Sequence, residues 1–262
     1  MITSIHNPKI QFVRKLQSRS RARREEKAFV VEGVRLVEEA LRLGWRASLV
    51  LYESSLDERG QKIVQGFAGQ GAAIEEVSPE VLQAASDTET PQGLLAVLPL
   101  HILPLPEQAD FIFIPDGVKD PGNLGSMLRS AASAGVDAVL LPEGTVDVFS
   151  PKVLRAAMGA HFRLPIQALT WAEIGDLVER SGLQVYLADA QAGISYTRAN
   201  FRLPLALVVG GEAEGASPFA NRLATGRVHI PMPGGMESLN AAIAAALLLF
   251  EVVRQREKHG NG

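Results

Sequence analysis

The strongest constraint on the fold is a series of short, mostly apolar segments in the second half of the chain. They alternate with amphipathic helical patterns. Strands are expected at 111–115, 138–141, 163–166, 184–188, 205–209 and 227–231, and helices at 123–134, 151–158, 171–181, 218–224 and 239–256. Strands that are apolar on both faces are typical of a mostly parallel sheet covered by helices. The pattern therefore predicts an α/β fold for this half.

A second, shorter α/β pattern precedes it and predicts a smaller domain. Here helices are expected at 9–18, 32–43, 61–69 and 78–85, and strands at 29–31, 48–52, 73–77 and 94–98. Three prolines, at positions 99, 104 and 106, then interrupt regular structure and stiffen the chain. We therefore predict domains at residues 1–98 and 110–258, joined by a proline-rich linker at 99–109.

Composition excludes several classes of protein. The 262-residue chain has no cysteine, which rules out disulfides, thiolate metal sites and a cysteine nucleophile. The longest apolar run, 241–250, is too short to span a bilayer, and the polar start does not resemble a signal peptide. The five histidines are scattered without metal-ligand spacing. We predict a cytoplasmic protein that uses neither a membrane nor a metal.

The charge distribution is uneven along the chain. Residues 1–27 hold eight Lys or Arg and two Glu, a charge of +6, whereas the whole chain carries −3. The remaining residues therefore carry −9. Such a segment is either a solvated helix or a surface for a polyanion, and the clustering favours nucleic acid. We predict phosphate contacts from Lys9, Arg14, Arg21, Arg23 and Arg24.

A polar loop and helix at 116–135 follow the first expected parallel strand. The helix is expected from Asn123, so that Asn123, Ser126 and Arg129 share one face. Arg129 either faces a pocket, where it would meet a phosphate or a nucleophile, or forms an ordinary ion pair, and spacing alone leaves both open. The glycine fingerprints of dinucleotide sites and P-loops are absent, which disfavours an unrelated nucleotide-binding enzyme.

A second loop, at 208–217, places Gly210, Gly211 and Glu212 directly after an expected strand. Glycines allow the backbone to approach a ligand closely. Taken alone, the segment is explained more simply as a strand-to-helix turn with solvated glutamates. Ligands bind beyond the carboxyl ends of parallel strands, however, and this loop is expected at that edge.

A third segment, 226–251, runs from a strand through a Pro/Gly turn into an almost wholly apolar helix. Ser238, Leu239 and Asn240 are expected to open this helix. Ser238 suits a helix N-cap and Leu239 the core. Asn240 within the first turn is harder to explain, because Asn disfavours helix interiors unless its side chain is hydrogen-bonded. We therefore expect a site wall here.

Together, these segments resemble the three signature motifs of the SpoU-TrmH family of RNA ribose methyltransferases, within the SPOUT class. The matching stretches are N-L-G-S-M-L-R-S-A-A-S-A-G at 123–135, G-G-E-A-E-G at 210–215 and I-P-M-P-G-G-M-E-S-L-N-A-A-I-A-A-A at 230–246. S-I-H-N-P-K-I-Q-F-V-R-K-L and F-V-V-E-G-V-R-L-V-E-E-A-L are similar to the family's RNA-binding substrate domain. One departure is the turn at Pro233, Gly234 and Gly235, which is longer or richer in proline than the family's.

The resemblance implies S-adenosylmethionine as cofactor, methylation of a ribose 2′-OH, a C-terminal trefoil knot and a homodimer. By position, the implied cofactor-binding residues are Leu187, Ala188, Gly210, Gly211, Ile230, Met232 and Leu239. The implied residues at the reactive end are Asn123, Arg129, Glu212, Ser238 and Asn240. The family often assigns the arginine as a base. We instead expect Arg129 to stabilise a developing alkoxide, because a guanidinium stays protonated.

Three functional hypotheses follow. The first is a ribose methyltransferase acting on structured RNA, with 23S-type ribosomal RNA favoured over tRNA because an extra N-terminal domain supplies recognition surface. The second is a non-catalytic RNA-binding or ribosome-assembly factor on the same fold, against which the intact motif residues weigh. The third is the unrelated nucleotide-binding enzyme that the missing phosphate loops disfavour.

Overall fold

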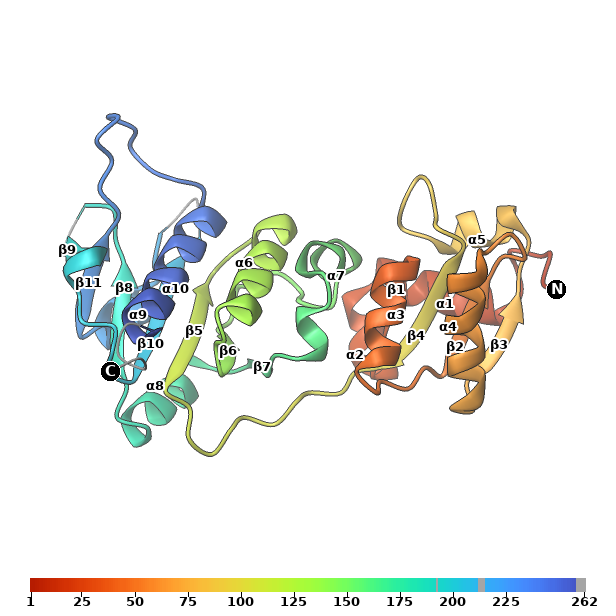
Figure 1. The fold of residues 1–262 in the computed structure, drawn as a ribbon, viewed down its shortest axis with the longest axis horizontal. Coiled ribbons are helices and arrows are strands. Elements are labelled where there is room, and N and C mark those ends of the chain that lie inside the picture. The colour runs from red at the N-terminus through yellow and green to blue at the C-terminus, as the bar shows by residue number, and fades with distance from the viewer. Residues whose placement is uncertain (192, 212–214, 258–262) are drawn as a thin grey trace. The chain divides into compact units, whose positions relative to one another are not determined.

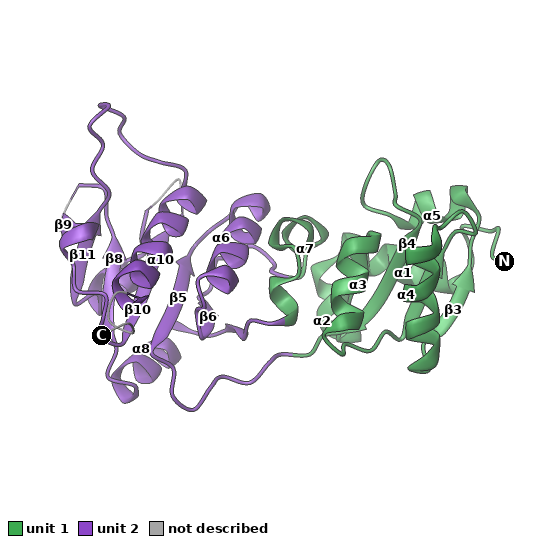
Figure 2. Cartoon of the chain, viewed as in Figure 1, with its two compact units in different colours: residues 1–101, 149–162 green, residues 102–148, 163–262 purple. Residues whose placement is uncertain are grey.

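The structure, a computed structural model, describes residues 1–191, 193–211 and 215–257. The chain divides into two compact units (Figures 1 and 2). Unit 1 consists of residues 1–101 and 149–162, and unit 2 of residues 102–148 and 163 onward. The sequence does not predict that residues 149–162, from the middle of the second α/β pattern, belong to unit 1.

Unit 1 is built on a four-stranded sheet of order β1-β4-β2-β3. Its strands are β1 (Ala28–Glu32), β2 (Leu49–Tyr52), β3 (Ala73–Glu76) and β4 (Leu94–Pro99). β4 runs antiparallel to both β1 and β2, and β2 pairs in parallel with β3. The helices are α1 (Pro8–Ser18), α2 (Ser20–Glu26), α3 (Val34–Arg42), α4 (Glu58–Gly69), α5 (Pro79–Ala85) and α7 (Pro151–Ala157).

Helices cover both faces of this sheet, because alternate side chains of β1, β2 and β4 enter different cores. Phe29 and Val31 of β1 pack in one core with residues of α3 and α4. Val30, between them, packs in the other core with residues of α1 and α5. Because such a strand is apolar on both of its faces, helices have to cover both sides of the sheet.

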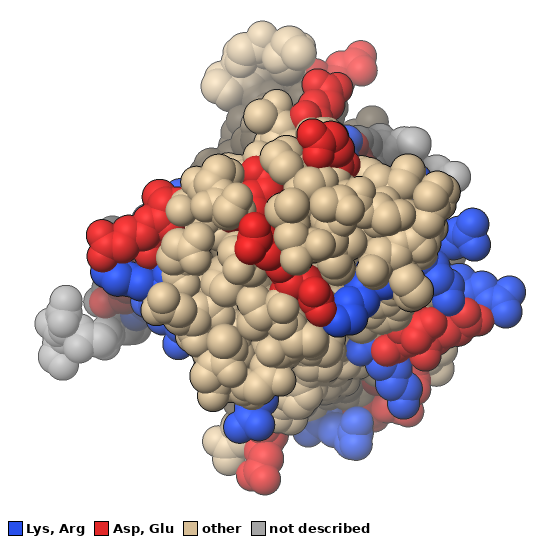
Figure 3. Space-filling model, turned by 90° about the vertical axis from the view of Figure 1, so that its right-hand side faces the viewer, with Lys and Arg blue, Asp and Glu red and all other residues tan. Residues whose placement is uncertain are grey.

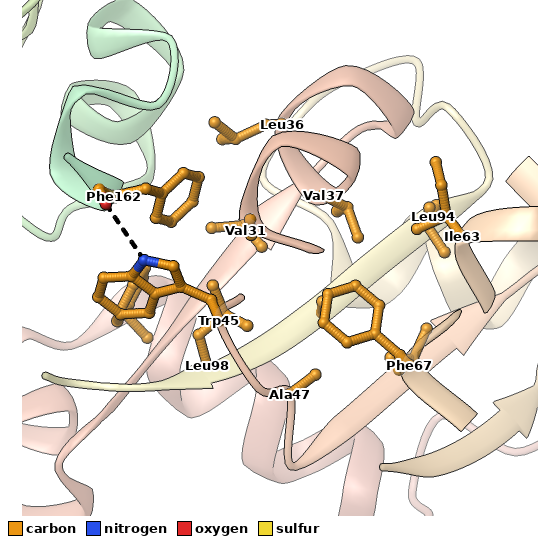
Figure 4. Packing of buried hydrophobic residues seen from close by; sticks show 14 of the residues in the cluster. Val31, Leu36, Val37, Trp45, Ala47, Ile63, Phe67, Leu94, Leu98 and Phe162 are labelled. Atoms are coloured by element: carbon orange, nitrogen blue, oxygen red, sulfur yellow. Dashed lines mark hydrogen bonds between the residues drawn. The ribbon is translucent and has the colours of Figure 1, made fainter. Parts of the chain in front are cut away.

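The segment 149–162 completes the first of these cores. Leu154 of α7 and Phe162, in the short 3₁₀ turn Ala160–Phe162, are buried among residues of β1 and α3. The Trp45 indole N–H donates to the Phe162 carbonyl across 3.3 Å (Figure 4). The Trp45 and Phe162 rings lie 5.3 Å apart, within the range of favourable aromatic pairs. These contacts explain why this segment belongs to unit 1.

The basic N-terminal segment forms two helices packed on unit 1. α2 is not predicted from the sequence, because S-R-A-R-R-E-E has too few apolar residues to show a helical period. Tertiary contacts select the helix instead. Ala22 is buried, and buried Arg23 donates from Nη1 to the carbonyl oxygens of Leu16 (2.5 Å) and Gln17 (3.1 Å) near the end of α1.

Unit 2 contains a seven-stranded sheet of order β7-β6-β5-β10-β8-β11-β9. Its strands are β5 (Phe111–Asp116), β6 (Ala138–Leu141), β7 (Ile166–Ala168), β8 (Gln184–Ala188), β9 (Ile194–Ser195), β10 (Leu205–Gly210) and β11 (Gly226–His229). Every strand pairing in the described part of this sheet is parallel, as the apolar strands predict. β7 begins three residues later than the sequence predicts.

Helices cover this sheet in two groups. α8 (Trp171–Arg180) and α9 (Pro218–Leu223) supply Ile174, Val178 and Ala220 to a core shared with β5, β8 and β10. α6 (Pro121–Ser133) and α10 (Ala241–Glu257) pack against each other and against β5 and β10 (Figure 1). The loops after β5, β8, β10 and β11 therefore lie at one edge of the sheet. None of the helices in the described residues is long and apolar enough to span a membrane.

Candidate functional site

A pocket of about 430 Å³ opens at the carboxyl edge of the unit 2 sheet, a size typical of small-molecule sites. The ends of β8, β10 and β11 and the start of α10 form its walls, so it brings together loops that are far apart in the sequence. Its lining comprises Ala188, Asp189, Ala190, Val209, Gly210, Gly211, Gly215, Ala216, Val228, His229, Ile230, Met232, Ser238, Leu239, Asn240, Ala241, Ala244 and Leu248.

Two glycines allow the wall after β10 to form. A Cβ atom at Gly210 would lie 2.5 Å from the Gly215 carbonyl carbon and 2.6 Å from the Ala216 nitrogen. A Cβ at Gly211 would lie 2.6 Å from the Gly117 carbonyl oxygen. Each obstacle is backbone, which cannot rotate away as a side chain can. The two glycines are therefore required by close approach of main chains.

A buried carboxylate fixes the same wall. Asp116, the last residue of β5, is 2% exposed, and its Oδ2 accepts a 2.6 Å hydrogen bond from the Ser217 backbone N–H. Its carbonyl oxygen accepts from the Gly211 N–H at 2.8 Å. One residue of β5 thus holds both sides of the loop that follows β10. Sequence reasoning missed Asp116, although its position at the end of a buried strand was a signal.

Asn240 is the N-cap of α10, which begins at Ala241. The sequence prediction was wrong here, because it gave the cap to Ser238 and placed Asn240 within the first turn. Its Oδ1 accepts from the backbone N–H groups of Ala242 (2.9 Å) and Ile243 (3.2 Å). The capping role explains why Asn is favourable here. Its Nδ2 also donates to Asn123 Oδ1 at 3.0 Å, which ties the start of α10 to the first turn of α6. The predicted juxtaposition of Asn123 and Asn240 is therefore present in the structure.

The residues predicted to hold a cofactor fall largely on this pocket. Ala188, Gly210, Gly211, Ile230, Met232 and Leu239 all line it. Leu187 does not, because alternation along β8 turns its side chain into the core, where it is 1% exposed. The apolar residues of the wall, Val209, Val228 and Leu248 among them, suit an uncharged ring system.

The residues predicted at the reactive end are placed differently. Ser238 lines the pocket from the exposed loop before α10, whereas Asn123 lies outside the lining and reaches it through Asn240. Arg129 is exposed on α6, beyond the pocket lining. Glu212 lies outside the described residues. Of this set, Ser238 and Asn240 thus line the pocket, whereas Arg129 lies on the surface of α6.

The predicted RNA-binding residues of unit 1 also differ among themselves. Arg23 is 5% exposed and holds α1 carbonyls, so its guanidinium does not face solvent as that prediction requires. Lys9 pairs with Glu75 and Arg21 with Glu25. Arg14 and Arg24 are exposed, and acidic side chains lie among the basic ones on the face shown in Figure 3.

Comparison with known proteins is consistent across the two units. Residues 110–250 match the model of the SpoU rRNA Methylase family, and residues 7–96 match the MRM3-like substrate binding domain. The chain belongs to the SpoU rRNA methylase family. Its fold is similar to an AdoMet-bound rRNA methyltransferase from Sinorhizobium meliloti, with a TM-score of 0.87, 30% identity and 97% of each chain covered.

Two further relatives differ in how much of this SpoU family member they cover. It is 33% identical to the 23S rRNA (guanosine(2553)-2'-O)-methyltransferase RlmP of Bacillus subtilis, over 96% of this chain and 98% of that protein. The TrmH/SpoU tRNA modifying enzyme of A. aeolicus covers only 58% of this chain and 78% of its own, with a TM-score of 0.52 and 26% identity. Likeness to these two rRNA methyltransferases thus extends over both units, whereas likeness to this tRNA enzyme extends over little more than half of the chain.

Proposed function

We propose that this protein transfers a methyl group from S-adenosylmethionine to a ribose 2′-OH of ribosomal RNA. The observation that carries the proposal is the pocket at the carboxyl edge of unit 2, because the second and third motif segments line it and the first is hydrogen-bonded to its wall. Main-chain approach at Gly210 forms one wall, and the Asn240–Asn123 hydrogen bond joins the other two segments. Family membership and full-length likeness to rRNA methyltransferases support the same reaction.

The pocket fits S-adenosylmethionine in size and in chemistry. Its apolar wall suits the adenine ring, and backbone groups near Gly210, Ile230 and Leu239 suit the polar edges of the adenosyl group. When bound, this cofactor supplies a methyl group activated by an adjacent sulfonium. The protein then has to align the ribose hydroxyl, exclude water and accept one proton.

We assign alkoxide stabilisation to Arg129 and orientation to Asn123 and Asn240. Arg129 is exposed and lies outside the pocket lining. Its guanidinium presents a planar fork of donors that suits an RNA phosphate and a nearby oxyanion. Ser238, on the pocket lining, or water then relays the proton. Glu212 remains a proposed member of this relay.

Ribosomal RNA is favoured over tRNA by unit 1. The tRNA enzyme of A. aeolicus covers 58% of this chain, whereas the rRNA methyltransferases of B. subtilis and S. meliloti cover 96% and 97% of it. We propose that unit 1 binds structured rRNA, with Arg14 and Arg24 as phosphate contacts, while residues 110–258 carry the reaction. A cytoplasmic location stays a prediction.

We also propose a homodimer and a trefoil knot, both from the family resemblance. A surface observation supports the dimer. Ile243, Leu247 and Phe250 of α10 are 54%, 40% and 49% exposed, and their spacing places them along one stripe of the helix. A helix that is apolar on opposite faces is usually buried on both. Leu247→Glu should convert a dimer to a monomer in light scattering, and an unchanged mass would contradict an interface on this stripe.

Two measurements test the proposed reaction. Isothermal titration with S-adenosylmethionine should show binding at a single site. Absence of binding would exclude the proposed methyltransferase activity. Ribose methylation should then be mapped in rRNA and tRNA from a deletion strain and from the same strain complemented with the gene. Loss and recovery of one rRNA methylation is expected. A change confined to tRNA would contradict the rRNA assignment, and no change would favour the non-catalytic RNA-binding factor.

The role of Arg129 is tested by comparing Arg129→Lys with Arg129→Ala. Both variants should lose turnover, because lysine keeps the charge but not the planar fork. A lysine variant with nearly full turnover at neutral pH would argue against the fork. An alanine variant that loses RNA binding but keeps its rate at saturating RNA would exclude the alkoxide role.

A further inference from the structure

A carboxylate on the pocket wall has no role in the three motifs. Asp189 directly follows β8 and lines the pocket between Ala188 and Ala190. Only 27% of its side chain is exposed. A carboxylate in the wall of a largely apolar pocket is stable only when it is paired and hydrogen-bonded.

Both oxygens of Asp189 are held in place but keep free capacity. Oδ2 accepts from Arg227 Nη1 at 2.9 Å, and Oδ1 accepts from the Gln191 backbone N–H at 3.0 Å. A carboxylate offers about four lone-pair sites. These two contacts therefore orient the group while leaving each oxygen able to accept one more hydrogen bond.

The same arginine connects Asp189 to the wall that follows β10. Arg227 Nη2 donates to Asn221 Oδ1 at 2.7 Å. The Asn221 amide in turn donates to the carbonyl oxygens of Ala216 (3.1 Å) and Ser217 (3.0 Å), and Ala216 lines the pocket. One guanidinium fork thus joins the wall after β8 to the wall after β10.

We propose that Asp189 binds the two ribose hydroxyls of the adenosyl group, and that Arg227 and Asn221 are positioning residues for it. The inference rests on the proposed use of S-adenosylmethionine. Two acceptor oxygens match a vicinal diol, and an acidic residue binds a ribose hydroxyl in the same way in dinucleotide-binding sheets. Asp189 also neighbours the apolar wall of Ala188 and Val228, which suits the adenosine half of the cofactor.

The test compares S-adenosylhomocysteine with its 2′-deoxy and 3′-deoxy forms by isothermal titration. Wild-type protein should bind each deoxy form about tenfold to a hundredfold more weakly, the range for hydrogen bonds to a charged group. Asp189→Asn should bind S-adenosylhomocysteine more weakly by a similar factor and should distinguish the deoxy forms much less. Asp176→Asn, an exposed residue of α8, is the matched control and should behave as wild type.

Two outcomes would overturn the assignment. An Asp189→Asn variant that weakens all three ligands equally, with the deoxy penalties intact, would show that Asp189 does not contact the hydroxyls. The cofactor's amino group is the other partner a carboxylate could take. In that case the loss caused by Asp189→Asn would disappear for 5′-methylthioadenosine, which lacks the amino-acid portion but keeps both hydroxyls.

The positioning residues have their own readout. Arg227→Lys keeps the charge but cannot hold Asp189 and Asn221 at once, so the penalty for the deoxy forms should shrink. Undiminished deoxy penalties in Arg227→Lys would exclude a positioning role. Failure of wild-type protein to bind S-adenosylhomocysteine would instead contradict the proposed function itself, and the two failures are therefore distinguishable.

Discussion

The pocket edge of unit 2 and the basic helices of unit 1 are built on different physical terms. At the pocket, Gly210 and Gly211 meet backbone atoms, and Asp116 is buried against backbone N–H groups. On α1 and α2, Arg14 and Arg24 are exposed, and Arg21 forms a surface ion pair. A glycine that touches backbone atoms tolerates almost no larger side chain, whereas each exposed charge makes only a small, additive contribution to binding or stability. Single changes should therefore be severe in the first region and mild in the second.

The largest effect is expected from Gly210→Ala. The new Cβ would lie 2.5 Å from the Gly215 carbonyl carbon, so the pocket wall has to move. Displacement of a site by about 1 Å can cost on the order of a hundredfold in rate, and we expect a comparable loss of affinity for S-adenosylhomocysteine in titration.

Gly175→Ala is the matched control for this prediction. Gly175 lies within α8, and a Cβ there would meet nothing within 4 Å. Alanine should leave binding unchanged and raise the free energy of unfolding by about 0.5–1 kcal/mol, because it restricts the unfolded chain and favours the helix. Equal affinity of the two variants for S-adenosylhomocysteine would contradict the claim that backbone contact at Gly210 shapes the pocket.

The contrast also explains which features the sequence predicts. Apolar strands predict the parallel sheet, and glycine and asparagine at strand ends predict the edge at which Gly210, Ile230 and Asn240 meet. Patterning does not predict partners that are distant in sequence. The packing of Phe162 on Trp45, the Arg23 bonds to α1 and the Arg227 link to Asp189 depend on tertiary contacts that leave no local period.

An intermediate effect is expected at Asn240, which combines a local and a distant role. Asn240→Ala removes the α10 cap, which costs about 0.5–2 kcal/mol, and the bond to Asn123. Asn240→Ser should retain the cap, because serine is an equally good N-cap, but it is too short to reach Asn123. We expect both variants to lose about tenfold in methyl transfer, the contribution of one positioning hydrogen bond.

Thermal unfolding separates the two roles of Asn240. The alanine variant should melt a few degrees lower than wild type, since about 1 kcal/mol shifts the midpoint by roughly 2–4 °C in a chain of this size. The serine variant should melt near the wild-type temperature. Full activity in the serine variant would show that the Asn123 contact is dispensable and that capping alone matters.

The smallest effects are expected from Arg14→Ala and Arg24→Ala on unit 1. Each phosphate contact that is lost should reduce the slope of log affinity against log salt by about 0.7–0.9, with little change in the affinity for S-adenosylhomocysteine. Lys62→Ala provides a control of equal charge, because Lys62 lies on α4 in an ion pair with Glu58 at 2.7 Å. A salt slope that is unchanged in the arginine variants, or reduced equally in the lysine variant, would show that binding depends on net charge and not on α1 and α2. The double arginine variant should reduce the slope by the sum of the single effects, since exposed sites without shared partners are additive.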